Sequence, residues 1–407
     1  MVNKMFHPNM HAYRQNRSTC TALLSLYDCW VRAAADGKIS GVVLLDLSAA
    51  FDLVEPTILM QKLRIYGLDD DFLEWISTYL IGRQQANWIS HVQSTFKDCS
   101  IGVPQRSNLG PLFFSIFFND LLYNIECDVE NYADDTTLSA SPNSVGEINE
   151  KLEMSCNAVS SWMSANQLKL NVDKTHIFTV GTKERLSRLP CKVQIVMNNV
   201  ALKYSGENEL LLGCHIAADL RWNKQLDELK IKLKKRLGSL SYLRSIASFR
   251  TKKCIAEGIF HSVMSYCFPL FAGCEKKKVQ ELQVLQNNAA RIICNAHLRT
   301  SRKSLFERLE WLSVYQLGMY YTLIMVFNIR KSGEPEYLAK YLMNDSRSNR
   351  IMRCNARLTL AVQSFVFRGS QVWNTLPSSI RLSSNSRIFK SKVKKWIEQH
   401  VPRFIDE

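Results

Sequence analysis

The chain has 407 residues, 46% of them hydrophobic and 22% charged, which excludes a disordered polypeptide and fits a folded protein of roughly two to three domains. The net charge is +15, but residues 41–140 hold 14 acidic and 5 basic residues, so this segment carries −9 and the remainder +24. An acidic centre between basic segments suits a cation site flanked by surfaces that attract a polyanion. Basic residues that only solubilise exposed helices explain the same excess equally well.

The twelve cysteines are scattered, with no CxxC pair and no zinc-ligand spacing, so we expect reduced thiols in an intracellular protein. No secretory signal opens the sequence. The stretch 258–274, which has no formal charge, includes a histidine and a proline and is shorter than the ~20 apolar residues of a membrane span. We therefore predict no membrane association.

Apolar spacing predicts an alternation of helices and strands along the first half of the chain. A strand, a helix, a hairpin, a helix and a strand in this order favour an α+β sheet with helices packed on one side. The expected elements are a helix over 22–30, a strand over 42–45, a helix from 56, an apolar helix from 110, a hairpin around 132–135, a helix from 144 opened by a capping box, strands over 168–171 and 177–180, and a helix from 222.

Three carboxylates follow the predicted strands. Asp134 and Asp135 lie side by side at the tip of the predicted hairpin, and Asp46 ends the apolar run 42–45. Adjacent anions repel each other unless a cation lies between them. If both elements belong to one sheet, the three carboxylates meet at one point and form a site for hard divalent cations, with Mg²⁺ the first choice. Two such ions drive in-line phosphoryl or nucleotidyl transfer.

Five motifs now stand in an order that resembles the reverse transcriptase region of non-LTR (LINE-type) retrotransposons. The likeness covers nearly all of the chain, and further matches lie at residues 285–291 and 373–377. The five motifs are Leu45-Asp46-Leu47-Ser48-Ala49-Ala50-Phe51-Asp52, Gly102-Val103-Pro104-Gln105 continuing to Phe113, Tyr132-Ala133-Asp134-Asp135, Leu168-Lys169-Leu170-Asn171 with Lys174-Thr175, and Leu212-Gly213 through Trp222.

The resemblance implies a right-hand polymerase fold and an RNA-directed DNA polymerase that adds dNTPs to a primer 3′-hydroxyl on an RNA template. The implied parts are partial fingers over residues 1–40, a palm over 41–222, a helical thumb over 223–290 and a mostly helical C-terminal region over 291–407. An endonuclease is expected elsewhere or lost, and nuclear action is expected from the resemblance alone.

The resemblance also assigns roles to single residues. Asp46, Asp134 and Asp135 would hold two Mg²⁺ ions, with Mn²⁺ as a substitute and the Leu47 carbonyl as an extra ligand. Phe51 would exclude a 2′-hydroxyl from the incoming nucleotide, since a bulky apolar ring offers it no partner. Gln105, Arg14 and Arg17 would contact the nucleotide or the template. Lys174 would offset phosphate charge or donate a proton to the leaving pyrophosphate. The primer–template backbone would be bound by the thumb side chains Lys224, Lys230, Lys234, Lys235 and Arg236.

Two departures from the family pattern predict an impaired, truncated copy. Arg106 replaces the glycine of a Pro-Gln-Gly motif, a position where glycine permits close approach and positive φ. Asn108 replaces a usually apolar residue, and little of the fingers precedes Asp46. A catalytically silent nucleic-acid-binding relic therefore remains an alternative, as does a maturase-like RNA-splicing cofactor, against which the motif at Trp373 argues.

Overall fold

The computed structural model describes residues 5–342, 350–351, 362 and 364–404, which form two compact units. Unit 1 comprises residues 1–22 and 38–206, and unit 2 comprises residues 23–37 and 207–407. The helix α1 (Thr19–Ala35) belongs to both units. The sequence predicted four parts with boundaries at 40, 222 and 290. By compactness the main boundary lies near residue 206, and the predicted thumb, the C-terminal region and most of α1 fall into one unit. The four parts stay a prediction.

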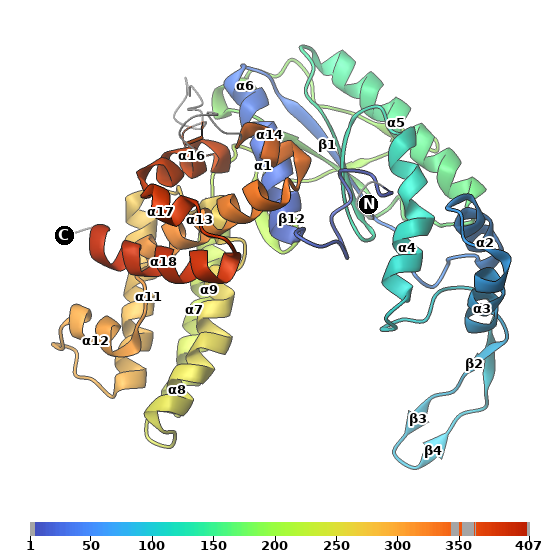
Figure 1. Ribbon diagram of the computed structural model, residues 1–407. Coiled ribbons are helices and arrows are strands. Elements are labelled where there is room, and N and C mark those ends of the chain that lie inside the picture. The colour runs from blue at the N-terminus through green and yellow to red at the C-terminus, as the bar shows by residue number, and fades with distance from the viewer. Residues whose placement is uncertain (1–4, 343–349, 352–361, 363, 405–407) are drawn as a thin grey trace. The chain divides into compact units, whose positions relative to one another are not determined.

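Unit 1 is built on a five-stranded sheet with the strand order β11–β8–β1–β7–β6 (Figure 1). The central strand β1 pairs antiparallel with β7 on one side and with β8 on the other. The strands are β1 (Ser40–Leu45), β6 (Asp128–Tyr132), β7 (Asp135–Ala140), β8 (His176–Val180) and β11 (Lys203–Tyr204). The strands expected at 42–45, at the hairpin and at 177–180 are thus present.

The core of unit 1 forms where apolar residues of alternate strand positions meet helices. Val43 and Leu45 of β1 belong to one buried cluster with Leu152 and Val159 of α5 (Val145–Ala165). The expected N-cap of α5 is also present, because the Ser144 side chain accepts a hydrogen bond from the backbone N–H of Glu147. This packing holds the sheet edge that follows Leu45.

The other elements of unit 1 include features that the sequence did not predict. The expected strand over 168–171 is reduced to one antiparallel bridge between Leu47 and Leu170. An unpredicted pair of short hairpins occupies residues 83–99, which we call the arm. The strands of the arm are β2 (Arg83–Gln85), β3 (Trp88–Ile89), β4 (Val92–Gln93) and β5 (Lys97–Cys99). The remaining elements of unit 1 are α2 (Pro56–Ile65), α3 (Asp70–Leu80), α4 (Gly110–Phe118), η2 (Asn119–Asn124), α6 (Lys183–Ser187), β9 (Val196–Met197) and β10 (Val200–Ala201).

Unit 2 begins with a hairpin and continues in helices. The hairpin turns at Leu212 and Gly213, both with positive φ, and matches the fifth motif. Its elements are β12 (Asn208–Leu211), β13 (Cys214–Ala217), α7 (Asn223–Tyr242), α8 (Phe249–Ala256), η3 (Glu257–His261), α9 (Ser262–Ser265), α10 (Phe268–Phe271), α11 (Lys276–Cys294), α12 (Arg302–Leu309), α13 (Val314–Ser332), α14 (Glu336–Tyr341), α16 (Phe365–Thr375), α17 (Ser378–Arg381) and α18 (Ser386–His400).

One segment, Arg302–Ser332, has the length and hydropathy of a membrane span, and 61% of its apolar window is buried inside the protein. Within unit 2 the Phe327 ring of α13 stacks on Phe389 of α18 at 4.1 Å, and Trp373 of α16 lies 5.8 Å from Phe389. A core helix with such neighbours meets the same criteria as a membrane helix. The absence of a membrane partner stays a prediction.

A buried carboxylate explains why most of α1 belongs to unit 2. Asp28 is 1% exposed, and its two oxygens accept the backbone N–H groups of Phe365 and Val366 at 3.1 Å each. These are unpaired donors in the first turn of α16, so the carboxylate caps that helix from a distant part of the chain. Burial raises the pKa of Asp28 to about 6, while the charge of Arg32 acts in the opposite direction.

We expect Asp28→Ala to lower the free energy of unfolding by about 2 kcal/mol or more, because two buried N–H groups lose their acceptor. Asp28→Asn keeps one acceptor and should lower the free energy of unfolding by less.

The folded-state pKa of Asp28, about 6, lies above the unfolded value of 3.8. The carboxyl therefore adds stability as the pH falls below 6, and it loses that stability as the pH rises through 6. Urea unfolding at several pH values between 7 and 5 measures the free energy of unfolding of the wild type and of Asp28→Asn. If that free energy changes with pH in the same way in both proteins, the raised pKa of Asp28 is contradicted.

Candidate active site

The two carboxylates that the sequence places far apart are cross-strand neighbours. In the β1–β7 register Leu45 faces Thr136, so the next pair along the antiparallel strands is Asp46 and Asp135. Opposite residues point to the same face, with Cβ atoms about 5 Å apart. Asp134 lies beside them in the two-residue turn between Tyr132 and Asp135, which are themselves paired. The backbone thus gathers the three predicted carboxylates at one edge of the sheet.

Their side chains, however, do not close into a finished cluster. Within the described residues no group of three or more His, Cys, Asp or Glu side chains is arranged to hold a metal ion. The joint coordination of a cation by Asp46, Asp134 and Asp135 therefore stays a prediction. Carboxylates that lie close together repel one another when all are ionised. The donor set itself, oxygen-only and anionic, fits a hard divalent cation.

Burial and the crowding of the three carboxylates shift the pKa of Asp135. Burial raises the pKa of Asp135 above its ordinary value, and the negative charges of Asp134 and Asp46 raise it further. A cation beside the pair would act in the opposite direction, since it favours the ionised forms.

The turn of the carboxylate hairpin is held by a residue that the sequence did not single out. Asn131, 1% exposed, donates from Nδ2 to the carbonyl of Ala133 at 2.7 Å and to Thr136 Oγ1 at 2.9 Å. Ala133 has φ of +58°, a left-handed conformation that costs a residue with Cβ. The side-chain amide of Asn131 therefore stabilises a strained turn that presents Asp134.

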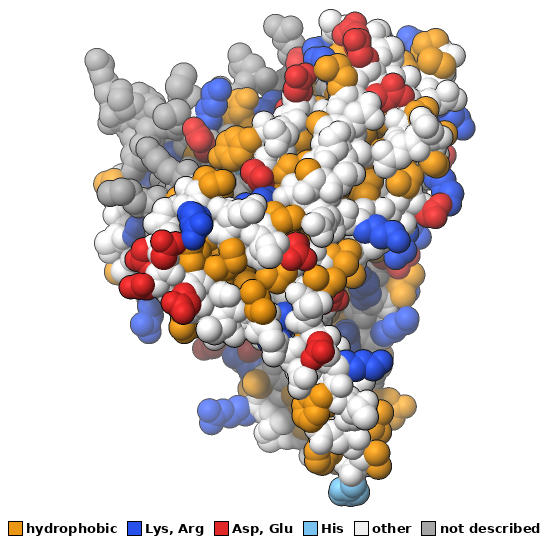
Figure 2. All heavy atoms as spheres, turned by 90° about the vertical axis from the view of Figure 1, so that its right-hand side faces the viewer, with side chains coloured by type: hydrophobic (Ala, Val, Ile, Leu, Met, Phe, Trp, Pro, Cys, Tyr) orange, Lys and Arg blue, Asp and Glu red, His pale blue; other side chains and the backbone are white. Residues whose placement is uncertain are grey.

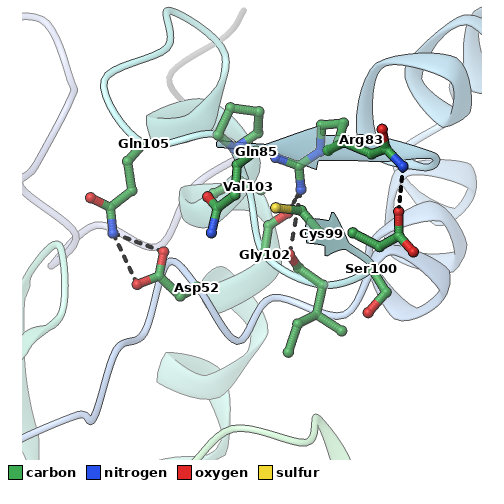
Figure 3. A pocket seen from close by; sticks show the side chains of 12 residues that line it. Asp52, Arg83, Gln85, Cys99, Ser100, Gly102, Val103 and Gln105 are labelled. Atoms are coloured by element: carbon green, nitrogen blue, oxygen red, sulfur yellow. Dashed lines mark hydrogen bonds between the residues drawn. The ribbon is translucent and has the colours of Figure 1, made fainter. Parts of the chain in front are cut away.

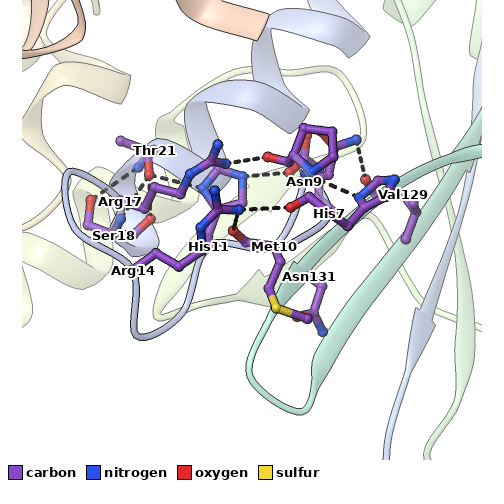
Figure 4. A network of polar contacts seen from close by, with 12 residues as sticks. His7, Asn9, Met10, His11, Arg14, Arg17, Ser18, Thr21, Val129 and Asn131 are labelled. Atoms are coloured by element: carbon purple, nitrogen blue, oxygen red, sulfur yellow. Dashed lines mark hydrogen bonds and ion pairs between the residues drawn. The ribbon is translucent and has the colours of Figure 1, made fainter. Parts of the chain in front are cut away.

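A polar network ties the N-terminal segment to this hairpin (Figure 4). Met10 forms a parallel bridge with Asn131, and the backbone N–H of His11 donates to the Asn131 carbonyl at 2.9 Å. The buried His11 ring bonds Glu130 at 2.7 Å through Nε2 and Thr21 at 3.1 Å through Nδ1. The segment expected to be partial fingers thus lies along strand β6.

The predicted basic contacts Arg14 and Arg17 belong to the same network. Arg14 donates to the carbonyls of His7 and Met10 at 2.8 and 3.0 Å, and Arg17 donates to the carbonyl of Pro8. These bonds fix the loop itself (Figure 4). Arg14 also lines a pocket of about 410 Å³ together with Asn108, so it is the better placed of the two for a ligand.

The fourth motif lies directly beside Asp46. The backbone N–H of Asn171 donates to the Asp46 carbonyl at 2.9 Å, and the N–H of Asp46 donates to Thr175 Oγ1 at 3.3 Å. Leu47, buried at 9% exposure, continues the pairing through its bridge to Leu170. Lys174 is exposed in the turn that follows, anchored through its backbone N–H to Asn171. The structure therefore brings the Lys174 segment next to the carboxylate edge.

Phe51 lies on an aromatic platform. Its ring stacks on Phe114 of α4 with a centroid distance of 4.3 Å and an interplanar angle of 17°, and the edge of Tyr13 approaches at 6.5 Å. Phe51 remains partly exposed. Burial raises the pKa of Tyr13, and the charge of Asp134 raises it further. Tyr13 thus connects the Phe51 platform with the carboxylate hairpin, a link that the sequence did not reveal.

The second motif packs against the end of the first through a glycine (Figure 3). The N–H groups of Gly102 and Val103 donate to the carbonyls of Val54 and Phe51 at 2.8 and 2.9 Å. A Cβ on Gly102, whose φ is +83°, would lie 2.7 Å from the Asp52 carbonyl oxygen. Gln105 donates from Nε2 to both Asp52 oxygens at 2.8 and 2.9 Å. Gln105 is thereby oriented by Asp52.

Arg106 occupies a position built for glycine. Its φ is +59°, and the Ser107 N–H donates to the Pro104 carbonyl at 3.3 Å. A four-residue turn with positive φ at its third residue is type II-like and prefers glycine or asparagine there. The arginine therefore holds an unfavourable backbone conformation, which is the physical content of the departure noted in the sequence.

The predicted thumb cations fall into two groups on α7. Lys224 pairs with Glu228 at 2.9 Å, and Lys230 pairs with Asp227 at 2.7 Å and with Glu281 at 2.6 Å. The second group has exposed side chains for which no salt bridge is found among the described residues: Lys234, Lys235 and Arg236. The apolar stripe of α7 is buried in unit 2 at Leu226, Leu229, Leu233 and Leu240.

Residues 1–227, more than half of the chain, match the family model described as reverse transcriptase (RNA-dependent DNA polymerase). The chain belongs to the reverse transcriptase family. The resemblance drawn from the five motifs is confirmed.

The curated relatives come from insect mobile elements. One is the probable RNA-directed DNA polymerase from transposon BS of Drosophila melanogaster, 26% identical over 298 residues, which are 69% of this chain and 32% of the relative. A second is the RNA-directed DNA polymerase from mobile element jockey of the same species, 22% identical over 74% of this chain and 33% of the relative. This family member therefore spans about a third of the length of these relatives.

Among solved structures, telomerases of Candida tropicalis and Candida albicans in complex with a fragment of telomeric RNA are similar to this chain. Each is 12% identical, with TM-scores of 0.39 and 0.41 over 77% and 98% of this chain and 51% and 56% of the telomerase chains. These scores are too low to support a detailed comparison, and the family assignment rests on the sequence match.

We expect Arg106→Gly to raise the free energy of unfolding by up to about 1 kcal/mol, since glycine adopts positive φ without the Cβ penalty. Arg106→Ala removes the guanidinium but keeps Cβ, and it should give no such gain. Chemical denaturation of the three proteins separates backbone strain from side-chain effects. Equal gains in both variants would assign the effect to the guanidinium instead.

We expect Asp135→Asn to raise the melting temperature without divalent ions at neutral pH, because it removes one of three crowded anions. The folded-state pKa of Asp135 is raised, so its protonated form is the stabilising one, and the advantage of Asn should fade as the pH falls through that pKa. Added Mg²⁺ should stabilise the wild type but not the variant. Asp71→Asn, at an exposed acid on α3, is the control. Equal Mg²⁺ stabilisation of all three proteins would contradict a cation site here.

Proposed function

We propose that this chain catalyses RNA-directed DNA synthesis, joining dNTPs to a DNA primer on an RNA template, within a right-hand polymerase fold whose palm is the sheet of unit 1. The observation that carries the proposal is the register that makes Asp46 and Asp135 cross-strand neighbours, with Asp134 in the adjacent turn. Membership of the reverse transcriptase family supports it. Action in the nucleus is part of the proposal and is supported by the resemblance alone.

Asp46, Asp134 and Asp135 would hold the cations, and the Leu47 carbonyl is a further oxygen ligand. When bound, two Mg²⁺ ions supply Lewis-acid activation of the attacking hydroxyl and neutralise triphosphate charge. The protein's part is to keep three carboxylates at one sheet edge despite their repulsion. Asn131 and the Asp46 backbone contacts do this before any substrate arrives.

Substrate selection follows from the side chains around that edge. The Phe51 ring, fixed against Phe114, resists displacement and would exclude a ribose 2′-hydroxyl. Gln105, oriented by Asp52, would contact nucleotide or template, and Arg14 would face the pocket that it lines. Lys174, which is exposed, would place its positive charge on the leaving pyrophosphate. The exposed cations Lys234, Lys235 and Arg236 would bind the primer–template backbone.

A second function, nucleic-acid binding without catalysis, is favoured by one observation. Arg106 strains the loop that carries Gln105, and a misplaced loop lowers the rate without removing the basic surfaces.

Primer extension on poly-rA/oligo-dT with Mg²⁺ tests the proposal. We expect dTMP incorporation by the wild type, a loss of at least 10³-fold in Asp134→Asn because a metal ligand is removed, and faster synthesis in Arg106→Gly than in Arg106→Ala. RNA binding that persists in all variants, with no incorporation even in Arg106→Gly, would establish the non-catalytic alternative.

A further inference from the structure

The arm, residues 83–99, exposes apolar side chains that the fold does not use. It consists of two short antiparallel pairs, β2–β5 and β3–β4, and it projects from the end of α3 (Figure 1). Near its tip Trp88, Ile89, Val92 and Phe96 are 67%, 75%, 73% and 61% exposed. Figure 2 shows hydrophobic side chains gathered at this projecting end of the molecule. Such a concentration marks an interaction surface rather than a packing element.

The charge of the arm favours a polyanion over a basic protein partner. Residues 84–96 contain no Asp, Glu, Lys or Arg, although they lie in the segment 41–140 with its charge of −9. Arg83 and Lys97 flank this stretch and Asp98 follows Lys97, so the arm as a whole carries one net positive charge. Exposed amides of Gln85, Asn87 and Gln93 alternate with the apolar residues and match the hydrogen-bonding edges of bases.

A second aromatic surface on unit 1 lacks this character. On α3 the rings of Phe72 and Trp75, each 50% exposed, lie 5.5 Å apart. Three aspartates, residues 69–71, and Glu74 accompany them, so this surface repels a polyanion. It therefore provides a matched control with the same residue type.

The arm is continuous with the proposed nucleotide site. A pocket of about 840 Å³ runs from the base of the arm to the second motif and is lined by Gln85, Ser100, Gln105 and Asp52, among others (Figure 3). Arg83 fixes this junction by donating to the Gly102 carbonyl at 2.6 Å. A nucleic-acid strand that contacts Gln105 can therefore follow this pocket to Gln85, three residues before Trp88.

We propose that the arm binds the unpaired part of the template RNA, with bases stacked on Trp88 and Phe96 and apolar contacts from Ile89 and Val92. Aromatic stacking accepts any base, so this site holds the strand without reading its sequence. The inference rests on the proposed use of an RNA template. It adds a binding site outside the catalytic pocket.

The test compares primer–templates whose 5′ template overhang is 3 or 20 nucleotides long. We expect the long overhang to bind wild type about tenfold more tightly at fixed salt, and Trp88→Ala/Phe96→Ala to lose most of that gain. Extension on the short overhang should be unchanged. Trp75→Ala should behave as wild type on both. Equal overhang effects in all three proteins would overturn the proposal.

Photocrosslinking with 4-thiouridine in the overhang keeps this inference separate from the proposed activity, since it needs no synthesis. We expect crosslinks within residues 83–99, mapped by mass spectrometry. Crosslinks confined to other segments would reject the arm as an RNA site. A variant that instead changes the oligomeric state in light scattering, with unchanged overhang dependence, would assign the arm to contacts between copies of this chain.

Discussion

The pairing of β1 with β7 is the constraint on which the site depends. It fixes Asp46 opposite Asp135, and a shift of one residue would turn one of the two carboxylates to the other face of the sheet. A register shift would separate the two carboxylates and relieve their repulsion, yet the fold keeps them together. Burial of every residue of β1 supplies the opposing stabilisation, because slippage would misplace all of its packed side chains.

The carboxylate edge is supported from two sides by segments distant in sequence. Asn131 and the N-terminal loop hold the hairpin, and Asn171 holds the Asp46 carbonyl. The sequence singled out Asp46, Asp134 and Asp135 because acids after apolar runs are conspicuous. It did not identify Asn131 or Asp52, since a single asparagine or aspartate in a motif is indistinguishable from an ordinary polar residue until its partners are known.

Other differences between prediction and structure have similar physical causes. The arm was missed because its strands are only two or three residues long, too short for a periodic pattern to show. The division into two units was missed because Asp28 finds its partner Phe365 at a separation of 337 residues. The strand expected at 168–171 became a single bridge, since the chain there turns at Asn171 to reach β8. The local sequence pattern predicted most helices and strands, whereas contacts between residues far apart in the sequence decide which of them pack into the same unit.

The family motifs differ in what they contribute. In unit 1 the matching residues Asp134, Gln105 and Lys174 are exposed and available to a ligand. In unit 2 the matching residues serve packing: Gln286 is fully buried and donates to the Leu312 carbonyl at 2.9 Å, and Asn374 bonds both backbone groups of Ile351. The motif residues Gln286 and Asn374 therefore have a packing role in this chain. The proposed catalytic residues all lie in unit 1, and the exposed cations of α7 are the proposed nucleic-acid contacts of unit 2.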